Sequence, residues 1–91
     1  MTVFELSNLE NFKAVCISCP ERKIEDVYCG DLLSWVMGKA KQNDAWITIM
    51  NNINVLAVAS LIDVSCIILS ESVEIDDEII KTANEKEINI F

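Results

Sequence analysis

The feature that most restricts the fold of this chain is the segment 46–60, WITIMNNINVLAVAS, in which asparagines separate two strongly apolar runs. The first run, Ala45–Met50, is almost continuously apolar, as is usual for a strand that is covered on both faces. Asparagine tolerates unusual backbone angles, and its side-chain oxygen accepts hydrogen bonds from free N–H groups at the start of a helix. The segment therefore predicts a buried strand that turns, at Asn52 or Asn54, into a helix running to about Leu61.

Similar patterns divide the rest of the chain into strands and helices. Runs of apolar, β-favouring residues predict strands, whereas apolar residues at helical spacing behind a capping residue predict helices. Helices alternate with strands along most of the chain, which indicates an α/β fold: a single domain over residues 1–91 with a mostly parallel sheet of about five strands flanked by helices. The predicted strands are 12–17, 24–28, 45–50, 65–70 and 88–91, and the predicted helices are 3–10, 31–40, 52–61 and 76–86.

The predicted helix over 52–61 is apolar nearly all round, although a helix that lies on a sheet normally has one wet face. Either another helix or a second copy of the protein must cover the remaining face. The sequence therefore predicts a homo-oligomer, with a dimer as its simplest form. The candidate interface residues belong to this helix and to the last predicted strand: Val55, Val58, Ala59, Ile90 and Phe91.

Charge and hydropathy exclude several classes of partner. Fifteen acidic and seven basic residues give a net charge of −8, which repels a phosphate backbone, so nucleic acid is not expected as a partner. The longest apolar run, 53–62, is about half the length of a membrane span, and the first residues lack the pattern of a signal peptide. The sequence therefore predicts a cytoplasmic protein with no membrane partner.

The side chains offer little for catalysis. The chain has no histidine, which excludes Ser-His and Cys-His nucleophile pairs, and it has no GxxxxGK loop to bind phosphate. The adjacent carboxylates Glu25 and Asp26 are interpreted as a solvated face. Trp35 and Trp46 each lie within an apolar run and are predicted to anchor the core. We therefore expect neither enzymatic activity nor a cofactor.

Four cysteines raise the question of a metal or redox site. Cys16 and Cys19 have the C-x-x-C spacing of redox dithiols and of half a metal site, with Cys29 and Cys66 as conceivable further ligands. A second C-x-x-C is missing, and Cys66 lies inside an apolar strand, where a small buried residue is the more common role. Cys16 and Cys19 are therefore retained only as weak candidates for a metal or redox role.

A ligand of an open parallel sheet binds beyond the carboxyl ends of the strands, where loops and helix N-termini converge. Three predicted strand-to-helix turns would meet at this edge, and polar residues in them, Ser72 included, would form a ring there. The alternative is that these residues only cap helices. The candidate ligand-binding residues are Asp31, Asn51, Asn52, Asn54, Ser70 and Glu71.

Three segments, GDLLSWVMGKA, AWITIMNNINVLAVASL and DVSCIIL, together resemble the DRTGG domain family. The resemblance covers 12–91 and is greatest to the small stand-alone members that accompany iron-only hydrogenase genes. The motif that names the family would fall on Glu21-Arg22 and on Glu25-Asp26-Val27. Arg22 keeps its place in that motif, whereas Asp26 and Val27 stand where the family has glycines.

DRTGG domains are similar to the N-terminal, non-catalytic domain of HPr kinase/phosphorylase and to a middle segment of some phosphotransacetylases, often beside CBS domains that sense adenine nucleotides. The resemblance implies a non-enzymatic regulatory or assembly module that binds a protein partner, such as hydrogenase or a metabolic enzyme. Together with the apolar helix over 52–61, it predicts a module that self-associates and binds such a partner. A small-ligand sensor that binds an adenine nucleotide or metabolite at the carboxyl ends of the strands is the alternative. A cysteine-ligated metal or redox carrier is the third possibility.

Overall fold

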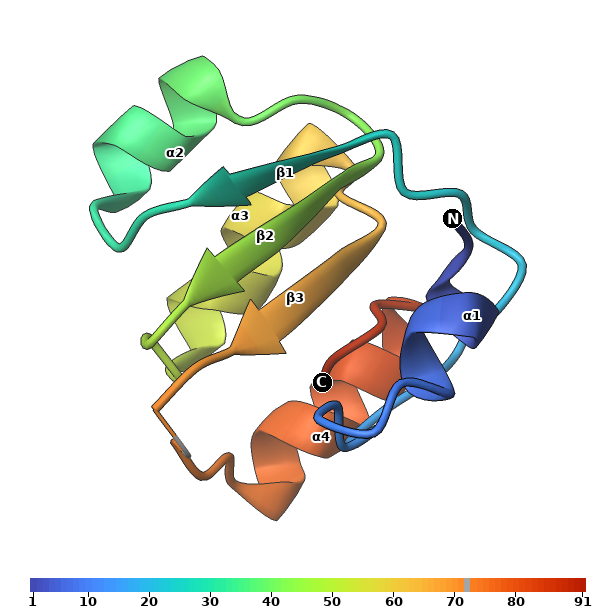
Figure 1. Ribbon diagram of the computed structural model, residues 1–91. Helices are drawn as coiled ribbons and strands as arrows, with labels where there is room; N and C mark the ends of the chain where they lie inside the picture. Colours follow the sequence, from blue (N-terminus) through green and yellow to red (C-terminus); the bar gives the residue numbers. More distant parts are fainter. Residues whose placement is uncertain (72) are drawn as a thin grey trace.

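The computed structural model describes residues 1–71 and 73–91. Helices and strands alternate from β1 onward, and a short helix precedes them (Figure 1). In chain order, the elements are α1 (Val3–Ser7), β1 (Asp26–Cys29), α2 (Leu33–Lys39), β2 (Asp44–Thr48), α3 (Ile53–Ile62), β3 (Cys66–Leu69) and α4 (Asp77–Glu85).

The three strands form a parallel sheet in the order β1-β2-β3. Tyr28 is the partner of Trp46, and Trp46 is the partner of Ile67, so neighbouring strands are in register along the middle of the sheet. The predicted α/β fold, with a parallel sheet flanked by helices, is therefore confirmed.

The prediction of about five strands is wrong, because the described residues form only three. The segments 12–17 and 88–91 make isolated bridges instead: Ile90 pairs with Ile67 on one side and with Cys16 on the other. The N–H groups of Val15 and Cys16 both donate to the Ile90 carbonyl, at 2.9 and 3.0 Å. Two consecutive residues thus oppose one, as in a β-bulge, and the regular alternation needed for a longer ladder is broken there.

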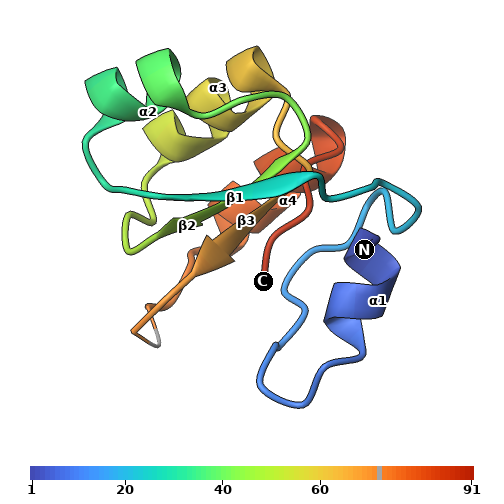
Figure 2. The same cartoon turned by 45° about the horizontal axis from the view of Figure 1, so that its top comes forward.

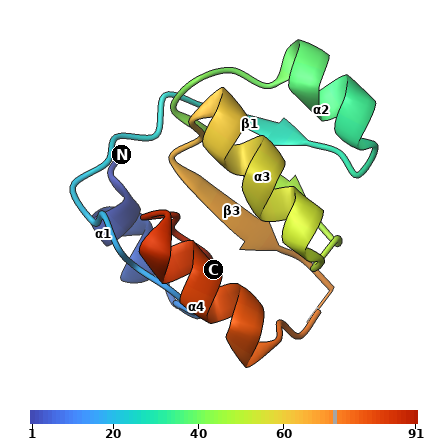
Figure 3. The ribbon, with the colours of Figure 1, turned by 180° about the vertical axis from the view of Figure 1, so that it is seen from behind.

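Helices α2, α3 and α4 all pack on one face of the sheet, whereas α1 packs on the other (Figures 2 and 3). The side chains of successive strand residues point to opposite faces. Trp46 and Ile67 therefore lie under the three helices, while their neighbours Ala45 and Cys66 pack against α1. The sheet has two cores of unequal size, and the smaller one depends on the N-terminal segment.

The two tryptophans have different roles. Trp46 is completely buried, and its indole N–H donates to the Gly30 carbonyl at 2.9 Å. Trp35 is instead 58% exposed on α2, with the Lys39 ammonium 4.6 Å from its ring centroid. The prediction that Trp35 anchors the core is wrong, because Leu33, Val36 and Ala40 form the inward stripe of α2 and Trp35 lies outside that stripe.

Asn89 joins three parts of the chain through one buried side chain, which is 1% exposed. Its Oδ1 accepts hydrogen bonds from the N–H groups of Ser18 and Cys19, at 2.9 and 2.8 Å. Its Nδ2 donates to the carbonyls of Cys19 and Ser65, at 3.0 and 2.9 Å. All four bonds reach backbone groups, so Asn89 fixes the loop after residue 17 against the start of β3.

The apolar core beneath the three helices predicts unequal costs for two leucine truncations. Leu56→Ala removes a side chain that is 1% exposed, so it should lower the free energy of unfolding by about 2–5 kcal/mol. Leu9→Ala removes a side chain that is 45% exposed and should cost less than about 1 kcal/mol. Urea unfolding followed by circular dichroism measures both, and equal costs would contradict the packing described here.

Candidate functional site

Asp31 follows β1 at the carboxyl-terminal edge of the sheet, and its side chain lies beside the end of β2. Its Oδ1 accepts hydrogen bonds from the Thr48 hydroxyl at 2.7 Å and from the Ile49 N–H at 2.9 Å. The Ile49 bond, followed by the Thr48 bond, lowers the pKa of the Asp31 carboxyl below its ordinary value. Asp31 therefore ties the β1-to-α2 loop to the end of the neighbouring strand as a carboxylate.

The asparagines of the turn after β2 also bond to the chain's own backbone. Asn51 Nδ2 donates to the Glu74 carbonyl at 2.6 Å, which links this turn to the segment before α4. Asn52 is the N-cap of α3, and its Oδ1 accepts from the Asn54 N–H at 3.0 Å. The predicted strand-to-helix turn is thus correct: Asn52 caps α3, while Asn51 connects the turn to the segment before α4.

The six candidate ligand residues do not line one common cavity. Ser70 and Glu71 border an open groove of about 950 Å³, whereas Asn51 and Asn52 border a separate, much smaller hollow, and Asp31 and Asn54 border neither. Ser72, the remaining polar residue of the third turn, lies outside the described residues. The candidate residues therefore do not form the continuous polar ring predicted from the sequence: four are divided between two places, and two border neither.

The surroundings of Cys19 and Cys66 disfavour a thiolate. Cys16 is buried, and its thiol lies 3.1 Å from Asn84 Oδ1 and 3.3 Å from the Ile88 carbonyl oxygen, either of which can accept its single S–H. Burial, followed by the negative charges of Glu87 and Glu21, raises the pKa of the Cys19 thiol, and burial raises the pKa of Cys66 to about 12. Reactive cysteines need the opposite, a lowered pKa.

Residues 1–71 and 73–91 contain no group of three Cys, Asp or Glu side chains placed to hold a metal ion. Over the same residues, no helix combines the length and hydropathy needed to cross a membrane. The weak candidates Cys16 and Cys19 therefore have no acidic or cysteine neighbours, within the described chain, that would complete a site.

Arg22 has a structural role in this fold. Its Nη1 donates to Asp63 Oδ1 at 2.8 Å, and its Nη2 donates to Asn43 Oδ1 at 2.7 Å and to the Asp63 carbonyl at 2.8 Å. Asn43 and Asp63 both have left-handed backbone angles, with φ of 68° and 65°. Arg22 thus holds together two strained turns at the amino-terminal end of the sheet, far along the strands from the candidate ligand residues.

The five candidate interface residues all lie in the core of a single chain: Val55, Val58, Ala59, Ile90 and Phe91 are each less than 9% exposed. Contacts within the chain therefore account for their apolar character. The apolar residues of α3 that do face outward are Ile53, Ala57 and Leu61. The prediction from the sequence missed these outward residues. A helical wheel of α3 would have separated them from the inward residues 55, 58, 59 and 62.

No family model, no curated protein and no solved structure matches this chain. The resemblance to the DRTGG family therefore stays a prediction, together with the hydrogenase or metabolic-enzyme partner that it implies.

The bonds to Asp31 predict a pH-dependent contribution to stability. The carboxyl has a lower pKa in the folded chain than in the unfolded chain, so its stabilising effect is complete above the ordinary value of about 3.9 and disappears as the pH falls through the folded value. Asp31→Asn should therefore be less stable than the original chain at neutral pH, and the difference should shrink below about pH 4. Urea unfolding across the acidic range tests this, and a difference that does not change with pH would contradict it.

Proposed function

We propose that this chain is a non-enzymatic assembly module that self-associates through the outer face of the helix layer formed by α2 and α3. The observation that carries the proposal is the distribution of charge. The chain has fifteen acidic residues, yet neither α2 nor α3 contains one. Charged residues are depleted in the cores of protein interfaces, so an acid-free face on a strongly acidic protein is suited to a second copy that would be repelled elsewhere.

The outer side of α3 supplies apolar area to this face. Ile53 is 49% exposed and Leu61 is 70% exposed, and Ala57 lies between them at helical spacing. Together they form an apolar stripe along the length of the helix, which Figure 3 views from outside. Val55 and Leu56, on the inner side, pack in the core, whereas the three residues of the stripe belong to neither core cluster of the described residues.

The outer side of α2 supplies a tryptophan beside small residues. Trp35 and Met37 are both more than half exposed. Ser34 and Gly38 are one helical turn apart, and around the helix axis they lie between Trp35 and Met37. A Cβ built on Gly38 would have no heavy atom within 4 Å, so packing within the chain does not require a glycine there. Glycine is unfavourable in a helix, and a close approach by another backbone is one reason to keep it.

The alternative of a small-ligand sensor has less support. Its ligand-orienting side chains, above all Asp31, Asn51 and Asn52, already make hydrogen bonds that stabilise the chain's own turns. A ligand at that edge would have to compete with these bonds. A partner connected with hydrogenase or another metabolic enzyme rests on the family resemblance alone and would bind in addition to the second copy.

Ala57→Glu tests the proposed self-association. Two-fold symmetry would place the new carboxylate and its copy in one interface, so the dimer dissociation constant should rise at least about tenfold while the fold is retained. Light scattering coupled to size-exclusion chromatography measures the mass, and circular dichroism measures the fold. Lys81→Glu on α4 is the control, because it makes the chain more acidic than Ala57→Glu does without altering the proposed face. A folded, monomeric original chain at micromolar concentration would overturn the proposal.

Gly38→Ala separates packing between copies from packing within the chain. Alanine is the better helix former and has room for its methyl group, so the isolated chain should gain about 0.5–1 kcal/mol of stability. Self-association should nevertheless weaken, because the methyl groups separate the two α2 helices. Urea unfolding of the dilute chain and light scattering of the concentrated chain measure the two effects. Unchanged or tighter self-association would count against α2 as part of the interface.

A further inference from the structure

The side of the sheet that faces α1 is covered unevenly. Two rows of paired residues cross this side: Val27, Ala45 and Cys66 in the first row, and Cys29, Ile47 and Ile68 in the second. In the first row, Ala45 and Cys66 are 2% and 0% exposed, whereas Val27 is 56% exposed. The cover that α1 provides therefore ends at β2, and the described residues leave β1 open on this side (Figure 1).

The second row shows the same gradient from β3 to β1. Ile68 packs against the core beneath α1, Ile47 is partly exposed, and Cys29 is exposed. Val27, Cys29 and Ile47 belong to neither core cluster of the described residues. These three neighbouring residues thus form an apolar patch on the sheet, here called the sheet patch.

The sheet patch is unusual because the sheet is parallel. The strands of parallel sheets are normally covered on both faces by helices, so an apolar residue on a middle strand is normally buried. β2 is the middle strand, and Ile47 is the one residue of β2 that is not fully buried. A helix laid over β1 and β2 would bury the sheet patch and complete the second helix layer.

The packing of α1 shows which kind of helix fits this face. Val3 and Leu6, three residues apart on α1, pack in one cluster with Ala45 and Cys66 of the sheet. Packed helices lie about 8–10 Å apart, which is about two strand spacings, so a helix beside α1 would be centred near β1. Apolar residues at the same helical spacing would then lie on the sheet patch.

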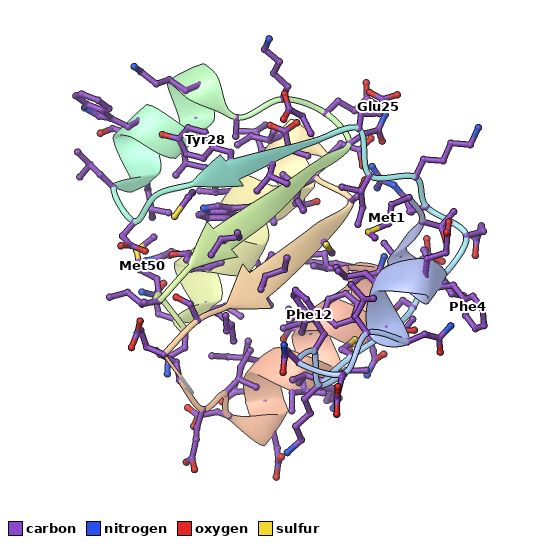
Figure 4. All side chains as sticks on the ribbon, viewed as in Figure 1. Met1, Phe4, Phe12, Glu25, Tyr28 and Met50 are labelled. Atoms are coloured by element: carbon purple, nitrogen blue, oxygen red, sulfur yellow. The ribbon has the colours of Figure 1, made fainter. Side chains whose placement is uncertain are left out.

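Carboxylates border the sheet patch along β1 and at both of its ends. Glu25 lies two residues before Val27 at the amino-terminal end of β1 (Figure 4). Asp26 is the first residue of β1, and Asp31 follows the strand. Within the described residues, none of these three carboxylates forms a salt bridge. Basic residues on the flank of a helix laid over β1 would therefore find unpaired negative charges beside them.

We propose that the sheet patch binds an amphipathic helix of a partner protein, with an apolar stripe on β1 and β2 and basic residues along the flank beside β1. The apolar stripe supplies the interface core, and the charges at the rim supply specificity and speed association. A second copy of this chain is less suited, because a protein with a net charge of −8 would bring further carboxylates to the same rim. The proposal is independent of self-association through α2 and α3, which lie on the other side of the sheet.

Three synthetic peptides test the proposal in fluorescence polarisation and in amide chemical-shift titrations. The probe, acetyl-LKQLLQALKQALK-amide, has its leucines on one helical face and its lysines along one flank. The charge control has glutamate in place of each lysine, and the shape control has the probe's composition with the leucines spread around the helix. We expect saturable binding of the probe and binding at least about tenfold weaker for each control. No binding of the probe, or equal binding of either control, would overturn the proposal.

Chemical shifts and three protein variants locate the binding. The shift changes should centre on residues 27–29 and 47, and changes centred on α2 and α3 would contradict the assigned patch. Val27→Lys, at a residue more than half exposed, should remain folded by circular dichroism and bind the probe at least about tenfold more weakly. Glu25→Lys should weaken binding of the probe and strengthen binding of the glutamate peptide, whereas Glu85→Lys, the same charge change on α4, should leave the preference as it is. Equal effects of the two glutamate variants would also contradict the assigned patch.

Light scattering separates this proposal from self-association. Val27→Lys should keep the mass of the original chain, and Ala57→Glu should bind the probe as the original chain does. Loss of self-association in Val27→Lys would show that a second copy covers the sheet patch and would overturn the proposal. A mass unchanged in Ala57→Glu would instead count only against the interface on α2 and α3.

Discussion

The rest of the structure depends on the order of the three parallel strands. Each strand lies beside the next one in the chain, and parallel crossovers are almost always right-handed, so α2, α3 and α4 are all directed to the same face. The opposite face has no crossover helix to cover it. The N-terminal segment covers part of that face instead, and Val3 and Leu6 of α1 pack on Ala45 and Cys66. A chain with this strand order therefore needs other interactions to hold the N-terminal segment against the sheet.

Two clusters of polar side chains provide these interactions. The amide of Asn89 bonds to the backbone at residues 18–19 and at Ser65, and the Arg22 guanidinium bonds to the turns at Asn43 and Asp63. Buried polar groups are costly without partners, and here each amide atom of Asn89 has two. The N-terminal segment is thus positioned by specific hydrogen bonds, while the three helices are positioned mainly by apolar contacts.

The sequence predicted the elements whose signals are local and missed those set by distant partners. Continuous apolar runs identified β2 and β3, and the asparagine cap at residue 52 identified the start of α3. Residues 12–17 have the composition of a strand, but the bulge opposite Ile90 depends on a contact across the whole chain. The candidate ligand residues lie in the turns after the strands, yet no local pattern could show that two pairs of them border separate hollows while Asp31 and Asn54 border neither.

The proposed interface follows from the same topology. Helices on one face form a layer whose outer side no other element covers, and the absence of carboxylates from α2 and α3 makes that side the least repulsive place for a second acidic chain.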